Sequence, residues 1–420
     1  MGCSSMNLNN QKAEVVMIEL NQSRRLGSVF ILSGTAIGAG MLALPLVSAQ
    51  VGFWAMMGLL FINFLVVVLA ALITLEANLL VEPGCSLYTM AVRVLGRWGR
   101  LFAILSPLLL FYSLMAAYLA GGGSLVFQYF GHSTMASPQV CVIIFTVFSG
   151  AFVYFSTRSV DLLSRLLFSV MMLAFAAALI TLFPAVDEQN LVYHPIHWEP
   201  ALVAIPVIFT SFGFHGSIPS IILYLKSDTR RIGTVLILGA VVPLAVYILW
   251  LLVATGVLSD QAFIQLSESG ESAGGLVREL SDVVAGNQLK LFLHVFSDLA
   301  LLTSFLGVSL GLFDYLASLL QRKNNWFGRL QTAFVTFIPP VIFALCYPEG
   351  FIVALGYASV ALAILAILLP VLIVGKLRIV KKHQSENYRA PGGKFSLILC
   401  FFFGCLVIFT QIMISIELLA

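Results

Sequence analysis

Two apolar stretches of this chain each contain a glycine-rich interruption followed by a proline. The first, residues 34–45, reads GTAIGAGMLALP, and the second, residues 210–219, reads TSFGFHGSIP. Glycine destabilises a helix interior by roughly 1 kcal/mol and proline removes a backbone hydrogen bond, so both stretches predict helices that break. A broken helix leaves N–H groups free at the start of one half and carbonyls free at the end of the other. The N–H groups suit a carboxylate, the carbonyls suit an ammonium group, and an amino acid zwitterion carries both.

The elements that must carry these interruptions are membrane-spanning helices. Of the 420 residues, 60% are hydrophobic and 10% are charged, whereas a soluble domain carries about 25% charged residues. Apolar runs of about 20 residues, the length that spans a bilayer, are continuous rather than alternating, which favours helices over a barrel. We therefore predict an all-α membrane protein, embedded in a lipid bilayer, with eleven transmembrane helices. They lie near residues 28–49, 53–78, 101–129, 138–157, 166–186, 200–224, 234–257, 288–320, 330–347, 350–374 and 395–418.

The basic residues predict the orientation of these helices. If the N-terminus is cytoplasmic, twenty of the 22 Lys and Arg residues fall in inside segments, and only Arg278 and Lys290 fall outside. This asymmetry is typical of cytoplasmic loops. We expect residues 1–26 to form a cytoplasmic N-terminal segment, residues 27–420 to form the transporter domain, and the C-terminus to lie outside.

The two interrupted helices are the first and the sixth predicted spans, so their starts lie five spans apart and the two halves of the domain have opposite orientations. Repeat one covers about 28–186, repeat two covers about 200–374, and the last helix, about 395–418, is additional. A pair of Gly/Pro-interrupted spans at corresponding positions indicates a transporter site built on inverted repeats. The alternative is that Gly34-x-x-x-Gly38 is a face for close helix packing; the matching interruption in the sixth span favours the site.

Several segments resemble the bacterial aromatic amino acid permeases. Residues 34–45 resemble their first helix, residues 206–217 (PVIFTSFGFHGS) their sixth, and residues 298–307 (DLALLTSFLG) with 311–316 (GLFDYL) their eighth. The resemblance runs from Gly27 to the last span, and the first 26 residues are the main departure from it. It implies the amino acid permease superfamily fold and proton-driven uptake of an aromatic amino acid across the bacterial inner membrane, with a periplasmic C-terminus. We expect tyrosine to be preferred. The alternatives are sodium coupling, or a broader specificity that includes tryptophan and phenylalanine; a channel is a distant one.

The predicted substrate site combines both interruptions. Backbone amides of Gly38, Ala39, Gly40 and Met41 are expected to bind the substrate carboxylate. The amine is expected to bind to carbonyls and a hydroxyl of Phe209, Thr210, Ser211 and Phe212. The predicted site also includes Thr35 and Gly213, which lie in the two interruptions.

Two further side chains are candidates for the same site. Tyr118 lies in the third span, which the resemblance places next to the first helix; Tyr112, on another face, is the rival, and packing explains either residue. His215 lies inside the sixth-span interruption, where it is expected to bond a substrate phenol or carry a proton. The alternative is a structural histidine.

Asp298 is the acid nearest to the middle of any predicted span. An acid inside the membrane indicates a functional site, because burial away from water disfavours its charged form and lets it exchange a proton. The alternative is a structural partner, the role that we expect for Glu76 and Asp314 near span ends. Thr303 and Ser304 form a hydroxyl pair of the kind that binds sodium in related transporters, but Thr303 lies about 140° from Asp298 around a helix. The resemblance favours the proton.

Other functional classes lack their motifs. The sequence contains no H-E-x-x-H, G-x-S-x-G, Walker A or clustered Cys/His pattern. We therefore expect no enzyme, no cofactor, no metal site and no nucleic acid partner.

Overall fold

The computed structural model describes most of the chain. The described residues are 24–48, 51–130, 137–155, 157–192, 198–225, 229–268, 273–283, 287–321, 326–380 and 388–417. Within these ranges the regular secondary structure is helical and contains no strand, as predicted. The N-terminal segment 1–26 lies outside the described residues, except for residues 24–26.

The main helices agree with the predicted spans to within several residues at most ends. Their bounds are Arg24–Ala36 with α2 (Gly40–Ser48), α3 (Phe53–Val81), α4 (Leu87–Phe130), α5 (Pro138–Phe155), α6 (Thr157–Leu182), α7 (Trp198–Ser211) with α8 (Ile218–Tyr224), α9 (Thr229–Val257), α12 (Asn287–Leu319), α13 (Trp326–Cys346), α14 (Phe351–Leu362) with α15 (Leu369–Val380), and α16 (Gly393–Glu417).

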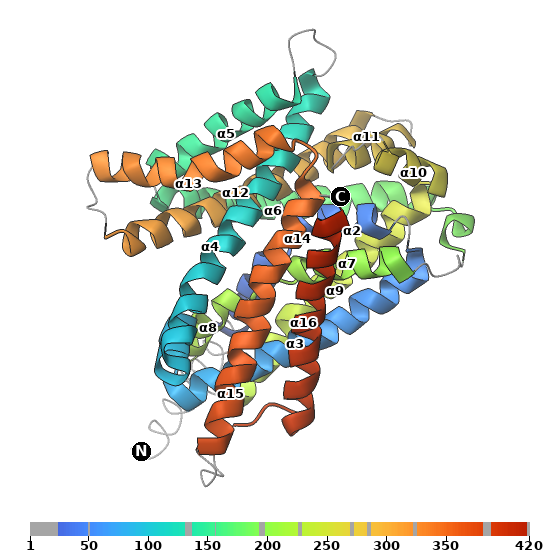
Figure 1. The fold of residues 1–420 in the computed structure, drawn as a ribbon. Coiled ribbons are helices and arrows are strands. Elements are labelled where there is room, and N and C mark those ends of the chain that lie inside the picture. Colours follow the sequence, from blue (N-terminus) through green and yellow to red (C-terminus); the bar gives the residue numbers. More distant parts are fainter. Residues whose placement is uncertain are drawn as a thin grey trace, which may run out of the picture.

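Helix length and composition support fewer spans than the eleven predicted from the sequence pattern. Within the described part of the chain, nine helices are long and apolar enough to cross a membrane, and the bent pair Arg24–Ala36 and Gly40–Ser48 makes ten. The remaining predicted span, 138–157, corresponds to α5, whose apolar part Pro138–Val153 is shorter. Figure 1 shows α5 beside α13 at one side of the bundle.

Two short helices lie between α9 and α12, in a segment where the sequence predicted no span. These are α10 (Asp260–Glu268) and α11 (Ala273–Val283), and they lie together at one end of the molecule (Figure 1). The buried face of α11 includes Leu276 and Leu280, and the Gly274 amide donates to the Ser124 hydroxyl of α4 at 3.2 Å. The segment therefore packs onto the helices as a cap.

Both interrupted helices break where the glycines predicted. In the first, the helix Arg24–Ala36 ends and α2 begins at Gly40 after a bend of 54°. In the second, α7 ends at Ser211, and a 3₁₀ turn (His215–Ser217) precedes α8. The two breaks are neighbours, because α2 packs against α7 near the middle of the bundle (Figure 1).

The tenth predicted span also departs from a regular helix. A π-helical segment, Ala363–Leu368, joins α14 to α15, and such segments are frequent at functional sites. Leu362, just before it, lies 3.5 Å from the position of a Cβ at Gly213. The irregular part of this helix therefore begins beside the second break.

Candidate substrate site at two helix breaks

The start of α2 presents backbone amides of two kinds. The Ala39 amide donates to the Ser304 hydroxyl at 2.9 Å, and the Met41 amide donates to the Gly38 carbonyl at 3.1 Å. The amides of Gly38 and Gly40 have no acceptor among the described residues. Two of the four predicted carboxylate-binding amides are therefore unpaired at the positive end of a helix.

Close contacts explain why glycine occupies both of these positions. A Cβ at Gly38 would lie 2.3 Å from the Ser304 hydroxyl oxygen, and one at Gly40 would lie 3.1 Å from that of Ser211. The Tyr118 side chain of α4 also lies near Ser304. Ser304 thus connects the first break to α4, although the sequence suggested an ion-binding role for it.

The carbonyl ends of the helix Arg24–Ala36 and of α7 meet at Tyr247, a residue that the sequence did not single out. Tyr247 of α9 places its hydroxyl oxygen 2.8 Å from the carbonyl oxygen of Ala36 and 2.6 Å from that of Ser211. These residues end the helices Arg24–Ala36 and α7. A tyrosine in an apolar span carries no local signal that it bonds to two other helices.

The predicted hydroxyls of the second break bridge neighbouring elements. Thr210 donates to the Leu355 carbonyl of α14 at 3.1 Å, and Ser211 donates to the Gly40 carbonyl at 3.1 Å. The Gly213 amide donates back to the Thr210 carbonyl at 3.1 Å. The hydroxyl protons are therefore used within the protein, while the hydroxyl oxygens keep lone pairs that can accept from an ammonium group.

The two predicted aromatic residues of α7 and its end lie on different sides. Phe209 packs its ring 6.0 Å from that of Phe403 in α16, and Phe212 packs 5.1 Å from the ring of Tyr247. Both side chains are fully buried. Phe212 is therefore the one beside the carbonyl ends.

Two predicted site residues form their hydrogen bonds outside this group. Thr35 is exposed and donates to the Ile31 carbonyl within its own helix at 2.7 Å. His215 is buried, its ring stacks on Phe214, and its Nε2 lies 3.2 Å from the Val67 carbonyl of α3. The His215 Nδ1 has no partner among the described residues, so it remains able to bond a ligand.

Asp298 belongs to a second polar group, which we call the acid cluster: Asp298, Tyr129 and His294. The Tyr129 hydroxyl donates to the Asp298 carboxylate at 2.7 Å, and its ring lies 5.1 Å from the His294 ring. The His294 Nδ1 is buried without a partner among the described residues. Within the same residues, Asp298 forms no ion pair.

The acid cluster lies on the same helix interface as the first break. Tyr118 of α4 meets Ser304 of α12, and further along the interface a Cβ at Gly121 would lie 3.0 Å from Leu301. The acid cluster continues this antiparallel contact, about 9 Å from Ser304 along α12 at the helical rise of 1.5 Å per residue. The Thr303 hydroxyl donates to the Leu299 carbonyl of its own helix at 2.7 Å.

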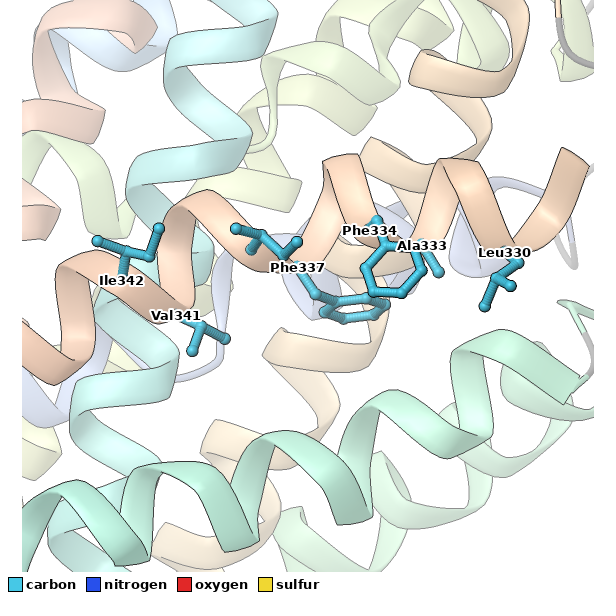
Figure 2. A pocket seen from close by; sticks show the side chains of 7 residues that line it. Leu330, Ala333, Phe334, Phe337, Val341 and Ile342 are labelled. Carbon is cyan, nitrogen blue, oxygen red and sulfur yellow. The ribbon is translucent and has the colours of Figure 1, made fainter.

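An apolar groove of about 320 Å³ lies along α13 (Figure 2). Its lining has no polar side chain to bind a zwitterion, and none of the predicted site residues contributes to it. The lining residues are Leu330, Ala333, Phe334, Phe337, Ile338, Val341 and Ile342.

Residues 21–411 match the tryptophan/tyrosine permease family. The chain is 39% identical to tyrosine-specific transport system 1 of Haemophilus influenzae over 92% of its own length and 96% of the relative's. It is 34% identical to a tryptophan-specific transport protein of Pseudomonas aeruginosa (90% and 92% covered) and 34% identical to glutamine transporter 2 of Aliivibrio fischeri (92% and 98% covered). The chain, a multi-pass membrane protein with two broken helices side by side, therefore belongs to the tryptophan/tyrosine permease family.

Proposed function

We propose that this protein is a secondary active transporter that takes up an aromatic amino acid, tyrosine in preference, together with a proton. The observation that carries the proposal is the pair of adjacent helix breaks, with unpaired amides at Gly38 and Gly40 and with carbonyl ends at Ala36 and Ser211. The proposal includes eleven spans arranged as two inverted five-helix repeats plus one helix. It also includes an inner-membrane location with a cytoplasmic N-terminus.

The substrate carboxylate is assigned to the start of α2. Its two unpaired amides lie at the positive end of the helix dipole, where an anion is stabilised. The ammonium group is assigned to the second break, where the carbonyls and the hydroxyl oxygens of Thr210 and Ser211 can accept from it. Tyr118 lies near Ser304, whose hydroxyl accepts from the Ala39 amide at the first break.

Proton coupling is assigned to Asp298. Its carboxylate has a neutral phenol as hydrogen-bond donor rather than a fixed cation, so protonation removes a charge that nothing else neutralises. Its position on the α4–α12 interface connects it to Ser304 and the first break. Protonation of Asp298 on one side of the membrane would therefore affect the substrate site through the packing of α4 against α12.

The test is uptake of labelled tyrosine, tryptophan and phenylalanine into proteoliposomes, with a pH gradient or a sodium gradient imposed separately. We expect concentrative tyrosine uptake driven by the pH gradient and abolished by an uncoupler. Uptake that only equilibrates would indicate a channel, and uptake that needs sodium would move the coupling site to Thr303 and Ser304. Competition by unlabelled glutamine tests the specificity that the name of the Aliivibrio relative suggests.

Two glycine variants test whether transport depends on the first break. Gly38→Ala places a Cβ against Ser304 and should abolish uptake, whereas Gly58→Ala in α3, where nothing lies within 4 Å, is the matched control. If both variants transport like the unmodified protein, the first break is not the substrate site.

The preference for tyrosine over phenylalanine is assigned to His215. A site that hydrogen-bonds a substrate hydroxyl discriminates strongly against its absence, because a buried polar group is then left unpaired. The free Nδ1 of His215 is the candidate donor or acceptor. An unchanged tyrosine-to-phenylalanine uptake ratio in His215→Leu would rule this residue out.

A further inference from the structure

Tyr247 joins the ends of two helices that belong to different halves of the chain. Its hydroxyl oxygen lies 2.8 Å from the carbonyl oxygen of Ala36 and 2.6 Å from that of Ser211, and the side chain is fully buried. Ala36 is the last residue of Arg24–Ala36, and Ser211 is the last residue of α7. One phenol therefore contacts the carboxyl ends of both half-helices at once.

The electrostatics of this place are unusual for a neutral side chain. The last carbonyls of a helix lack intrahelical partners, and the C-terminal end carries about −0.5 elementary charge. A phenol has one proton to donate, so it can satisfy one of the two carbonyls at a time. Two partly negative helix ends thus share a single hydrogen-bond donor.

Such an arrangement has the character of a cation site. In transporters with broken helices, the carbonyls at half-helix C-terminal ends coordinate the coupling cation. The Tyr247 ring lies 5.1 Å from the ring of Phe212, which is a neutral neighbour. The phenol therefore provides the positive hydrogen that both carbonyls face.

We propose that the Tyr247 hydroxyl occupies the place of a monovalent cation between the two half-helix ends and closes this position to sodium. Tyr247 is a positioning residue: it holds the helix Arg24–Ala36 and α7 together with a neutral donor, so that this junction needs no ion. The inference rests on the proposed function, because it treats the breaks as the transport site. It places any coupling ion elsewhere in the molecule.

The test uses the ligand-free, full-length protein in detergent, and it measures the midpoint of thermal unfolding in sodium chloride and in choline chloride at equal ionic strength. Tyr247→Ala removes the ring and opens the space between the carbonyls. We expect sodium to raise its midpoint in a saturable manner relative to choline, and to leave that of the unmodified protein unchanged. Equal midpoints of Tyr247→Ala in the two salts, or a sodium effect of equal size in both proteins, overturn the proposal.

Tyr247→Phe keeps the ring and removes only the hydroxyl, so it leaves both carbonyls unpaired without making room for an ion. We expect its midpoint to fall in both salts, without rescue by sodium. The matched control is Tyr112→Phe, which removes a single hydroxyl-to-carbonyl bond of 2.8 Å, to Val335 of α13. A loss in Tyr247→Phe no greater than in this control contradicts the proposal, even if Tyr247→Ala fails to fold.

Uptake of labelled tyrosine provides a second readout that a merely structural tyrosine would not change. We expect uptake by the unmodified protein to be the same in sodium and choline, and uptake by Tyr247→Ala to require sodium. If Tyr247→Ala takes up tyrosine equally in both salts, the cation-substitute role is wrong. If the unmodified protein takes up no amino acid in either salt, the proposed function fails, whereas the unfolding comparison still decides the role of Tyr247.

Discussion

Two acids in the long helices of this protein have opposite surroundings. Glu76 of α3 is 1% exposed and is held by Arg378 of α15 through two hydrogen bonds of 2.7 and 2.6 Å. It also accepts from the Ala390 amide at 2.7 Å. Asp298 of α12 accepts from the neutral Tyr129 hydroxyl and has no ion pair among the described residues.

The difference separates a structural acid from an exchangeable one. A carboxylate fixed by a guanidinium is part of an ion pair, and removal of either charge leaves the other without its partner. The Glu76 pair therefore fastens the connection before α16 onto α3, and Arg378 extends it by donating to the Gly393 carbonyl at 2.7 Å. A carboxylate with only a neutral donor can gain a proton without stranding a partner charge. This contrast is the physical basis for assigning proton coupling to Asp298.

Breaking the fixed pair should have the largest effect on stability. Arg378→Met leaves the Glu76 carboxylate buried without its cation, and we expect it to lower the free energy of unfolding by about 3–5 kcal/mol. The measurement is thermal or denaturant unfolding in detergent. The double variant Glu76→Gln/Arg378→Met should recover part of the loss. Equal stability of Arg378→Met and the unmodified protein would remove the structural half of the comparison.

Neutralising the exchangeable acid should change transport rather than stability. Asp298→Asn keeps an acceptor for Tyr129, so we expect its free energy of unfolding to stay within about 1 kcal/mol of the original. It should still exchange tyrosine across the membrane but lose accumulation driven by a pH gradient. Counterflow and gradient-driven uptake in proteoliposomes measure the two activities. Continued accumulation with a pH gradient alone would make Asp298 structural.

Removing the neutral donor should have a smaller effect. Tyr129→Phe deprives the Asp298 carboxylate of one hydrogen bond, which favours the protonated form. We expect uptake to continue at a rate reduced by about threefold to tenfold, as follows from a bond worth about 1 kcal/mol, with its pH dependence moved to higher pH. The control is Tyr315→Phe, which loses a bond of 3.1 Å to the Ile104 carbonyl. Identical pH profiles for the two variants would separate Tyr129 from coupling.

Native cysteines can place the two acids on opposite sides of the membrane without disturbing either one. Cys85 follows the end of α3 that carries Glu76, and the exposed Cys346 ends α13, on the side where α12 begins. In single-cysteine variants in intact cells, we expect an impermeant maleimide to label Cys346 and to spare Cys85. Burial, and then the charge of Glu82, raise the pKa of the Cys85 thiol, so after permeabilisation its labelling should accelerate at higher pH. Labelling of Cys85 alone in intact cells would reverse the proposed orientation.

Local sequence alone predicted the apolar helices and the two breaks, and it singled out the unusual acid. Glycine and proline change helix stability through their own backbone, so Gly38 and Gly213 mark the breaks without reference to any neighbour. A carboxylate inside an apolar run is likewise a local anomaly, which is why Asp298 was found. The short helices α10 and α11 were missed because their apolar faces are too brief to separate from a loop.

The partners of these residues were decided by the tertiary structure. Tyr247, Tyr129 and His294 lie in apolar runs where an aromatic side chain with a polar tip is ordinary. Their roles arise from helices distant in the sequence: Tyr247 bonds to Ala36 and Ser211, and Tyr129 bonds to Asp298. The same holds for Thr35, which the sequence grouped with the site and which the path of its helix turns outward. A hydrogen bond between helices depends on their packing and rotation, and these are set by all the contacts of the bundle together rather than by any single segment.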